Sequence, residues 1–208
     1  MTLLEARRKI IELGQPVVDT VDIAALLQID RNRASKVLTR LGDNGEVIRL
    51  RRGKWVVPQG TRNKIDRLEV PEGLAAPSPS YISLQTALFY HGLISQIPEV
   101  TYAVTTGKAR RYETPLGVFS LHHIEPDFFF GFESKGSRWL KMATQEKAVV
   151  DFLYLSQARS RLFAALPEIE LLKSFRLRVA REMIDRIPFR SRRAHVRNRF
   201  EDFVAARS

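Results

Sequence analysis

Residues 19–45 read DTVDIAALLQIDRNRASKVLTRLGDNG. The segment predicts two helices separated by a turn at Ile29-Asp30, because Asp30 is a residue type that caps helices and Asp19 or Thr20 can cap the earlier one. The later helix carries apolar residues at positions i, i+3, i+4 and i+7, which is the spacing of a buried helix face. These residues are Ala34, Val37, Leu38 and Leu41. The stretch therefore predicts a helix-turn-helix.

The flanking residues complete a small unit with its own core. An earlier helix is predicted by the apolar spacing of Leu3, Ala6, Ile10 and Leu13, and Gly14 ends it. Residues 46–50 and 54–57 predict two short strands, joined by a turn at Arg51-Arg52-Gly53. Three helices followed by a β-hairpin in about sixty residues are typical of a winged helix-turn-helix.

The third helix turns a polar and basic side away from its apolar stripe. A recognition helix enters the major groove of DNA, where Asn can pair with adenine and Arg with guanine. The basic hairpin suits the DNA backbone or the minor groove. The candidate DNA-binding residues are Arg31, Asn32, Arg33, Ser35, Lys36, Thr39, Arg40, Arg49, Arg51, Arg52 and Lys54. Some winged helices bind proteins instead, so a protein-binding module is the alternative.

The charge distribution also points to a polyanionic partner. The chain has 34 Lys+Arg against 23 Asp+Glu, a net charge of +11. Residues 1–60 carry a net +4 and residues 171–208 a net +7, whereas residues 61–156 are balanced. Since basic side chains that neutralise phosphates release condensed counterions, double-stranded DNA is the expected partner. A basic protein that uses its charge only for solubility is the alternative.

The composition excludes several classes of protein. The chain of 208 residues contains no cysteine, so disulfides, thiolate zinc sites and a cysteine nucleophile are excluded. No apolar run approaches the ~20 residues that span a bilayer, and no apolar signal segment follows the basic residues near the start. We therefore expect a cytoplasmic protein that does not bind a membrane.

The pattern along the chain predicts an α+β protein in two parts. Proline and glycine punctuate residues 58–80. We expect a winged helix-turn-helix over 1–60, a linker over 61–75, and a mixed α/β domain over 76–208 that ends in basic helices. Strands are predicted near 100–106, 116–124 and 138–142. The helix after Thr144 is apolar nearly all round and should be the central buried helix.

The middle of the chain offers two weak catalytic patterns. His122 and His123 lie near acidic residues, but neighbouring residues on a strand point to opposite faces, so the two are poorly placed to share one metal ion. Asp127 with the Gln145-Glu146-Lys147 segment resembles a nuclease pattern of close to chance specificity. We expect no metal, no cofactor and no enzymatic activity. A DNA nuclease, or a non-specific architectural nucleic-acid-binding protein, is the alternative function.

The middle segment also resembles a known family. Tyr81-Ile82-Ser83-Leu84 and Ile97-Pro98-Glu99-Val100, followed in order by Thr114-Pro115-Leu116-Gly117 and Ala143-Thr144-Gln145-Glu146-Lys147-Ala148, are similar to the central block of AbiEi-type antitoxins of type IV toxin–antitoxin systems. The resemblance covers roughly residues 1–156, and Gln145 stands where the family has Pro. It implies a transcriptional repressor of its own operon, binding an operator with inverted repeats. It also implies a functional link to a nucleotidyltransferase-like toxin.

The C-terminal segment predicts two basic amphipathic helices. Apolar residues at helical spacing over 169–183 predict one helix, which must end before Pro188, and those over 196–204 predict another. Three roles stay open for this segment: a second phosphate-contacting surface, a solvated face packed on the central domain, or a membrane-surface helix.

Overall fold

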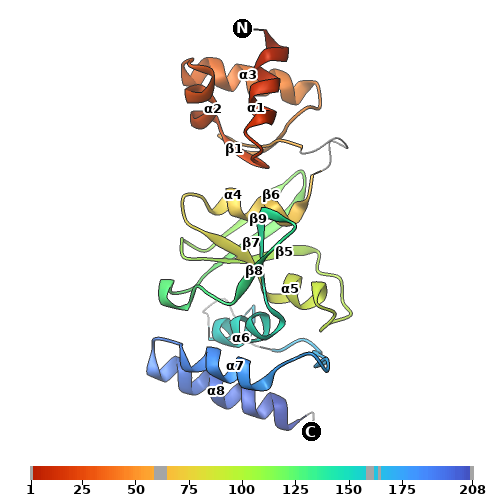
Figure 1. Cartoon of the computed structure of the whole chain (residues 1–208), viewed down its shortest axis with the longest axis vertical. Coiled ribbons are helices and arrows are strands. Elements are labelled where there is room, and N and C mark those ends of the chain that lie inside the picture. Colours follow the sequence, from red (N-terminus) through yellow and green to blue (C-terminus); the bar gives the residue numbers. More distant parts are fainter. Residues whose placement is uncertain (1, 59–64, 158–161, 164, 207–208) are drawn as a thin grey trace.

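The computed structural model describes residues 2–58, 65–157, 162–163 and 165–206. These residues form an N-terminal unit (2–58) and a C-terminal unit (65–206) that follow one another along the long axis of the molecule (Figure 1). Within the described residues there are eight α-helices and two β-sheets. The α+β class predicted from the sequence is confirmed.

The N-terminal unit consists of three helices packed on a small antiparallel sheet with strand order β1-β3-β2. Its elements are α1 (Leu3–Glu12), β1 (Val17–Asp19), α2 (Thr20–Leu27), α3 (Arg31–Asp43), β2 (Ile48–Arg51) and β3 (Lys54–Val56). The predicted helices and hairpin are therefore present. The apolar residues predicted for the helices lie in one buried cluster together with Val47, Trp55 and Val57.

The ends of α1 follow from its sequence. Thr2 and Glu5 form a capping box, in which the Thr2 hydroxyl accepts from the Glu5 N–H and the Glu5 carboxylate accepts from the Thr2 N–H. Gly14 has a φ of +59°, a conformation that favours glycine and turns the chain out of the helix.

The C-terminal unit is built on a six-stranded mixed sheet with strand order β6-β7-β5-β4-β9-β8. Its strands are β4 (Ser80–Ile82), β5 (Val100–Thr105), β6 (Arg110–Thr114), β7 (Gly117–His123), β8 (Phe132–Lys135) and β9 (Ser137–Ala143). Its helices are η1 (Arg67–Glu69), α4 (Val70–Ala75), α5 (Leu84–Tyr90), η2 (Pro126–Phe128), α6 (Gln145–Leu155), α7 (Leu177–Asp185) and α8 (Arg190–Ala205). The strands predicted near 100–106, 116–124 and 138–142 correspond to β5, β7 and β9.

Helix α6 is the central helix of this unit, as predicted. It lies between the large sheet and the pair α7–α8, which forms the end of the molecule opposite the N-terminal unit (Figure 1). Every residue from Glu146 to Leu155 is buried. The Thr144 hydroxyl caps the helix by accepting from the Lys147 N–H.

Two predicted boundaries are wrong. The linker expected over 61–75 is helical from Arg67 onward, and Val70 and Leu74 are buried because α4 packs between the small and the large sheet. Residues 61–64 lie outside the described residues. The helix predicted from residue 169 begins only at Leu177.

The sequence patterns also missed three strands of the large sheet. Strands β4 and β8 have three and four residues, too few to show a clear alternation. Strand β6 reads RRYET and lies at an edge of the sheet, where exposed residues replace the apolar alternation that marks a half-buried strand.

The two units share a continuous apolar contact. Val17, Leu50 and Val56 from the small sheet belong to the same buried cluster as Val70 and Leu74 of α4. The small sheet therefore has two covered faces, one under the N-terminal helices and one against α4.

Two polar contacts join the units beside this apolar surface. The indole N–H of Trp139 on β9 donates to the carbonyl oxygen of Gly14 at 2.9 Å. The guanidinium of Arg51 on β2 lies 5.6 Å from the ring centroid of Tyr112 on β6. The edge strand β6 and the strand next to the opposite edge, β9, thus touch the N-terminal unit.

We expect Gly73→Ala to destabilise the protein by about 1–3 kcal/mol, the usual cost of an overpacked contact. A Cβ at Gly73 would overlap the side chain of Val17, whereas glycine to alanine in a helix normally gains about 0.5–1 kcal/mol. Urea unfolding measures the change. Gly42→Ala in α3 is the comparison, because its new Cβ would meet one atom of the Trp55 ring at 3.3 Å, a close contact that a shift of a few tenths of an ångström relieves. An unfolding midpoint for Gly73→Ala equal to or above that of the parent would contradict this packing.

Candidate nucleic-acid interface

Helices α2 and α3 are joined by a tight turn over Gln28–Asp30. Gln28 adopts a left-handed conformation with φ of +55°, and its N–H donates to carbonyls of the last turn of α2. Asp30 caps α3 by accepting from the Arg33 N–H at 2.9 Å. This backbone hydrogen bond lowers the pKa of the Asp30 carboxyl. The cap predicted from the sequence is therefore present.

Helix α3 has one buried apolar side and one exposed polar side. Ala34 and Leu38 are fully buried and Leu41 is 1 % exposed. All seven candidate residues of α3 are exposed: Arg31, Asn32, Arg33, Ser35, Lys36, Thr39 and Arg40. Two have partners within the helix region, since the Thr39 hydroxyl donates to the Ser35 carbonyl and Arg33 lies 3.3 Å from Asp30 in an exposed ion pair.

The hairpin presents three of its four candidate residues to solvent. Arg49, Arg51 and Arg52 are exposed. The Arg49 guanidinium lies 5.7 Å from the centroid of the Trp55 ring, and that of Arg51 lies over Tyr112. The two aromatic rings lie against the guanidinium groups without neutralising their charge.

The prediction for Lys54 is wrong. Its side chain is only 4 % exposed, and its ammonium lies 2.7 Å from the Asp19 carboxylate. Lys54 begins β3, the middle strand of the small sheet, and stands directly opposite Asp19 of β1. Lys54 therefore forms a partly buried ion pair inside the unit and is not available to a phosphate. The sequence placed Lys54 at the start of the strand after the turn but did not show that Asp19 lies opposite it.

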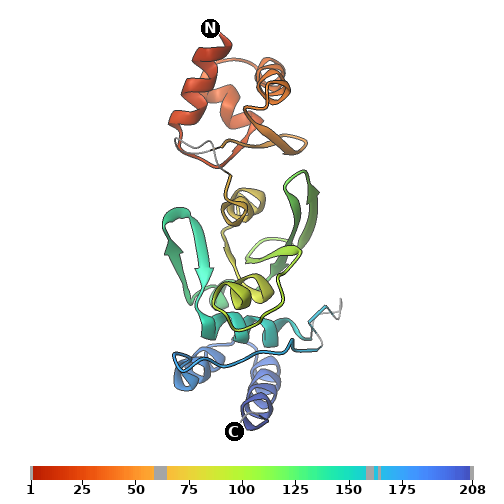
Figure 2. The same ribbon diagram turned by 90° about the vertical axis from the view of Figure 1, so that its right-hand side faces the viewer.

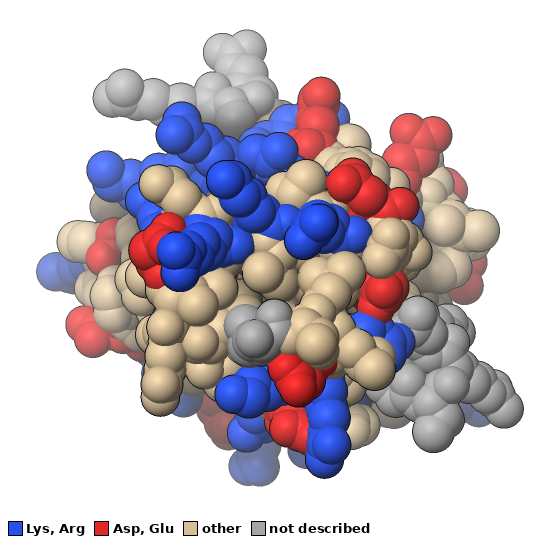
Figure 3. All heavy atoms as spheres, turned by 90° about the horizontal axis from the view of Figure 1, so that it is seen from above, with Lys and Arg blue, Asp and Glu red and all other residues tan. Residues whose placement is uncertain are grey.

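Helix α3 lies at the free end of the molecule (Figure 1), whereas the hairpin lies at the junction with the C-terminal unit. Viewed along the long axis from that end, Lys and Arg side chains gather in a band across one half of the surface, while acidic side chains are scattered around it (Figure 3). Because α3 is the helix that crosses this end (Figure 1), its polar side is open to a large ligand.

The histidines of the C-terminal unit form no metal site among the described residues. His122 packs against Phe163 and Tyr102, and its burial lowers its pKa to about 4. His123 lies on the opposite face of β7 and its Nδ1 is 2.9 Å from the Gly107 carbonyl oxygen. The expectation that strand geometry separates the two rings is confirmed.

Lys147, the lysine of the nuclease-like pattern, belongs to a buried polar network. Its ammonium donates to Asp151 at 2.7 Å and to the Phe128 carbonyl at 3.0 Å, and lies 3.3 Å from the Phe128 ring centroid. The other carboxylate oxygen of Asp151 accepts from Tyr81 at 3.0 Å and from Ser83 at 2.7 Å. Lys147 and Asp151 are both 0 % exposed. Asp127, by contrast, is exposed on η2.

The network should make folding stability depend on pH above neutrality. Burial lowers the pKa of Lys147 to about 8, although Asp151 opposes the shift. Between pH 8 and 10.5 the unfolded chain keeps a proton at this lysine that the folded chain releases, so the stability contributed by this group rises with pH. In urea titrations, we expect the free energy of unfolding of the parent, relative to that of Lys147→Met, to increase as the pH rises from 7.5 to 9.5. A difference that stays constant over this interval would contradict a buried, titrating ammonium.

Most arginines of α7 and α8 have partners inside the C-terminal unit. Arg181 forms a bidentate pair with Glu201 at 2.8 Å for both bonds, and Arg197 pairs with Asp185. Arg193 donates to the carbonyl oxygens of Ile187 and Pro188. Arg186 lies over the Phe130 ring, and Arg192 lies over the Tyr154 ring. These contacts favour a face packed on the central domain over a free phosphate-binding surface. No helix among the described residues has the length and apolar content needed to cross a bilayer.

Comparison with known proteins adds no family. No protein-family model matches the chain. No curated protein matches it either. The geometry of α3, the hairpin and the buried network therefore carries the functional argument.

Proposed function

We propose that the chain is a sequence-specific DNA-binding protein whose N-terminal unit is a winged helix-turn-helix and whose α3 is the recognition helix. The observation that carries this proposal is the complete exposure of the polar side of α3 at the free end of the molecule, while its apolar stripe is buried. A helix presented in this way fits the major groove, with its N-terminal residues near base edges. In this proposal the chain acts by binding alone.

The chemistry of the exposed residues supports readout by α3 and positioning by the hairpin. Asn32 and Arg33 lie in the first turn of α3, where side chains can reach adenine and guanine edges. Arg49 and Arg52 of the hairpin are exposed cations suited to phosphates, which fix the register of the protein but carry no base information.

The resemblance to AbiEi-type antitoxins suggests the biological setting. We propose that the chain represses its own operon by binding inverted repeats in the operator, and that the C-terminal unit is needed to counter a nucleotidyltransferase-like toxin. The internal pairing of the arginines in α7 and α8 suits this end of the C-terminal unit to a role other than general DNA binding.

A nuclease-protection footprint on the DNA upstream of the gene tests the DNA-binding part. We expect one or two protected stretches that survive an excess of random-sequence duplex. The same DNA incubated with the protein and magnesium, without added nuclease, should remain intact. Protection that disappears with competitor would overturn sequence-specific binding, and magnesium-dependent cutting would favour the nuclease alternative.

Co-expression tests the antitoxin part separately. The neighbouring gene product should arrest growth alone, and the full chain should restore growth. Absence of any growth defect, or a defect that the full chain does not relieve, would remove the antitoxin role without affecting the DNA-binding proposal.

A further inference from the structure

The start of strand β6 and the loop before it bring two basic side chains, Arg110 and Lys108, next to the hairpin of the N-terminal unit. Strands β2 and β6 are in contact, and Arg51 of β2 stacks over Tyr112 of β6. Arg51, Lys108 and Arg110 line one cavity of about 190 Å³ together with Tyr112. The cavity therefore receives three cations from two units that are far apart in the sequence.

The alternation of β6 separates cavity-lining residues from their neighbours. Arg110 and Tyr112 line the cavity, whereas Arg111 and Glu113 do not. Arg111 instead lies 3.7 Å from Glu113 in an ion pair. Among the described residues, neither Lys108 nor Arg110 is ion-paired, and the described lining of the cavity contains no carboxylate. Both side chains are exposed, so their charge is available to an anion.

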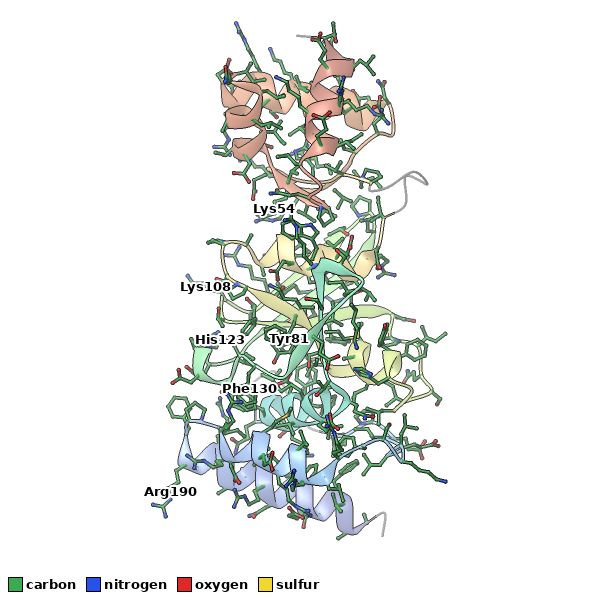
Figure 4. All side chains as sticks on the ribbon, viewed as in Figure 1. Lys54, Tyr81, Lys108, His123, Phe130 and Arg190 are labelled. Carbon is green, nitrogen blue, oxygen red and sulfur yellow. The ribbon has the colours of Figure 1, made fainter. Side chains whose placement is uncertain are left out.

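The cavity lies on the same side of the molecule as α3. In Figure 2, α3, the β2–β3 hairpin and the β6–β7 hairpin all lie toward the right-hand side, while β8 and β9 lie toward the left. Figure 4 places Lys108 at the margin of the large sheet. The elements that carry the basic residues, which are α3, the β2–β3 hairpin and the edge strand β6, therefore lie on one side of the molecule.

We propose that this cavity binds backbone phosphates of duplex DNA that flanks the segment read by α3. The proposal rests on the proposed DNA-binding function and adds a contact from the C-terminal unit. Duplex DNA carries one charge per ~1.7 Å of its axis, so a duplex seated on α3 presents phosphates all along this side. Arg51, held by the Tyr112 ring, and the two cations beside it form the receiving site.

The test compares two variants that lose the same charge. Lys108→Gln/Arg110→Gln removes the two cations that the C-terminal unit places in the cavity. Arg111→Gln/Arg138→Gln removes two exposed cations outside it, one on the far face of β6 and one on β9. Binding is measured by fluorescence anisotropy across a salt series. Two duplexes are used: the footprinted segment extended by ten base pairs on each side, and the central part of that segment without its flanks.

We expect the slope of log affinity against log salt to fall by about 2 for Lys108→Gln/Arg110→Gln, because each lost phosphate contact removes ~0.9 from it. Affinity for the extended duplex should fall about tenfold at moderate salt. The control pair should change neither slope nor affinity, and on the trimmed duplex both variants should match the parent. Circular dichroism checks that each variant is folded.

Three outcomes would overturn the proposal, and each leads to a different conclusion about the cavity and the proposed function. Equal slopes for the two variant pairs, with intact sequence-specific binding, would remove the phosphate site but leave the proposed function standing. Absence of binding to any duplex would remove both. Titration with inorganic pyrophosphate that shifts the amide resonances of Lys108 and Arg110, with unchanged DNA binding in the variant, would reassign the cavity to a small anion.

Discussion

Replacing Asp151 by alanine is expected to lower the free energy of unfolding by about 3–5 kcal/mol, the usual cost of removing one partner of a buried ion pair. Lys147 would keep its position on α6 but lose its carboxylate at 2.7 Å, while its ammonium stays fully buried. Tyr81 and Ser83 would lose their common acceptor. One truncation thus leaves three buried polar groups without their present partner.

Urea unfolding at pH 7 measures this effect, and two variants calibrate it. Lys147→Met/Asp151→Leu removes both charges and should cost much less than Asp151→Ala, because no unpaired charge remains buried. Glu182→Ala breaks the exposed pair with Arg178 one turn away and should cost no more than about 0.5 kcal/mol. If Asp151→Ala proved as mild as Glu182→Ala, the network would not be a dry, closed ion pair.

Asn32→Ala and Arg33→Ala are each expected to weaken binding to the specific site by about 1–3 kcal/mol and to relax base preference there. Both side chains are exposed in the first turn of α3, so the folded structure should be unaffected. Within the part of the chain that the structure describes, Arg33 pairs with exposed Asp30 alone, at 3.3 Å. Such a surface pair contributes little to stability, so Arg33 can leave Asp30 and bind a guanine instead.

Arg52→Ala is the matched comparison for readout. Arg52 is also an exposed arginine, but it lies at the hairpin turn, where contact with phosphates would weaken binding to all sequences equally. Electrophoretic shifts with the specific duplex and with a random-sequence duplex separate the two behaviours. If the α3 variants lost affinity equally for both duplexes, α3 would not be the reader.

The N-terminal unit was predictable because its signals are local. Caps such as Asp30, the regular apolar stripe of α3 and the glycine turns each act within one or two turns of helix or one hairpin. The error at Lys54 has a different cause. Whether a lysine beside a turn is free or paired depends on its cross-strand neighbour, and Asp19 is 35 residues away in the sequence.

The C-terminal unit was less predictable because its signals are long-range. The apolar character of α6 indicated a central helix, and the i,i+4 spacing of Lys147 and Asp151 is a local signal of an ion pair. Nothing local shows that this pair is fully buried or that Asp151 meets Tyr81 of β4. Net charge summed over 61–156 was also misleading, since β6 places Arg110 beside the hairpin while the compensating acids lie elsewhere.

The hydrogen bond from Trp139 to the Gly14 carbonyl gives the protein an intrinsic optical reporter. The chain has two tryptophans. Trp55 is 5 % exposed in the core of the N-terminal unit, whereas the indole of Trp139 bridges from β9 to the chain just after α1. In a Trp55→Phe background, emission would come from that bridge alone. A red shift on adding DNA would show that the two units separate when the duplex binds, and an unchanged spectrum would show that they bind it as one rigid body.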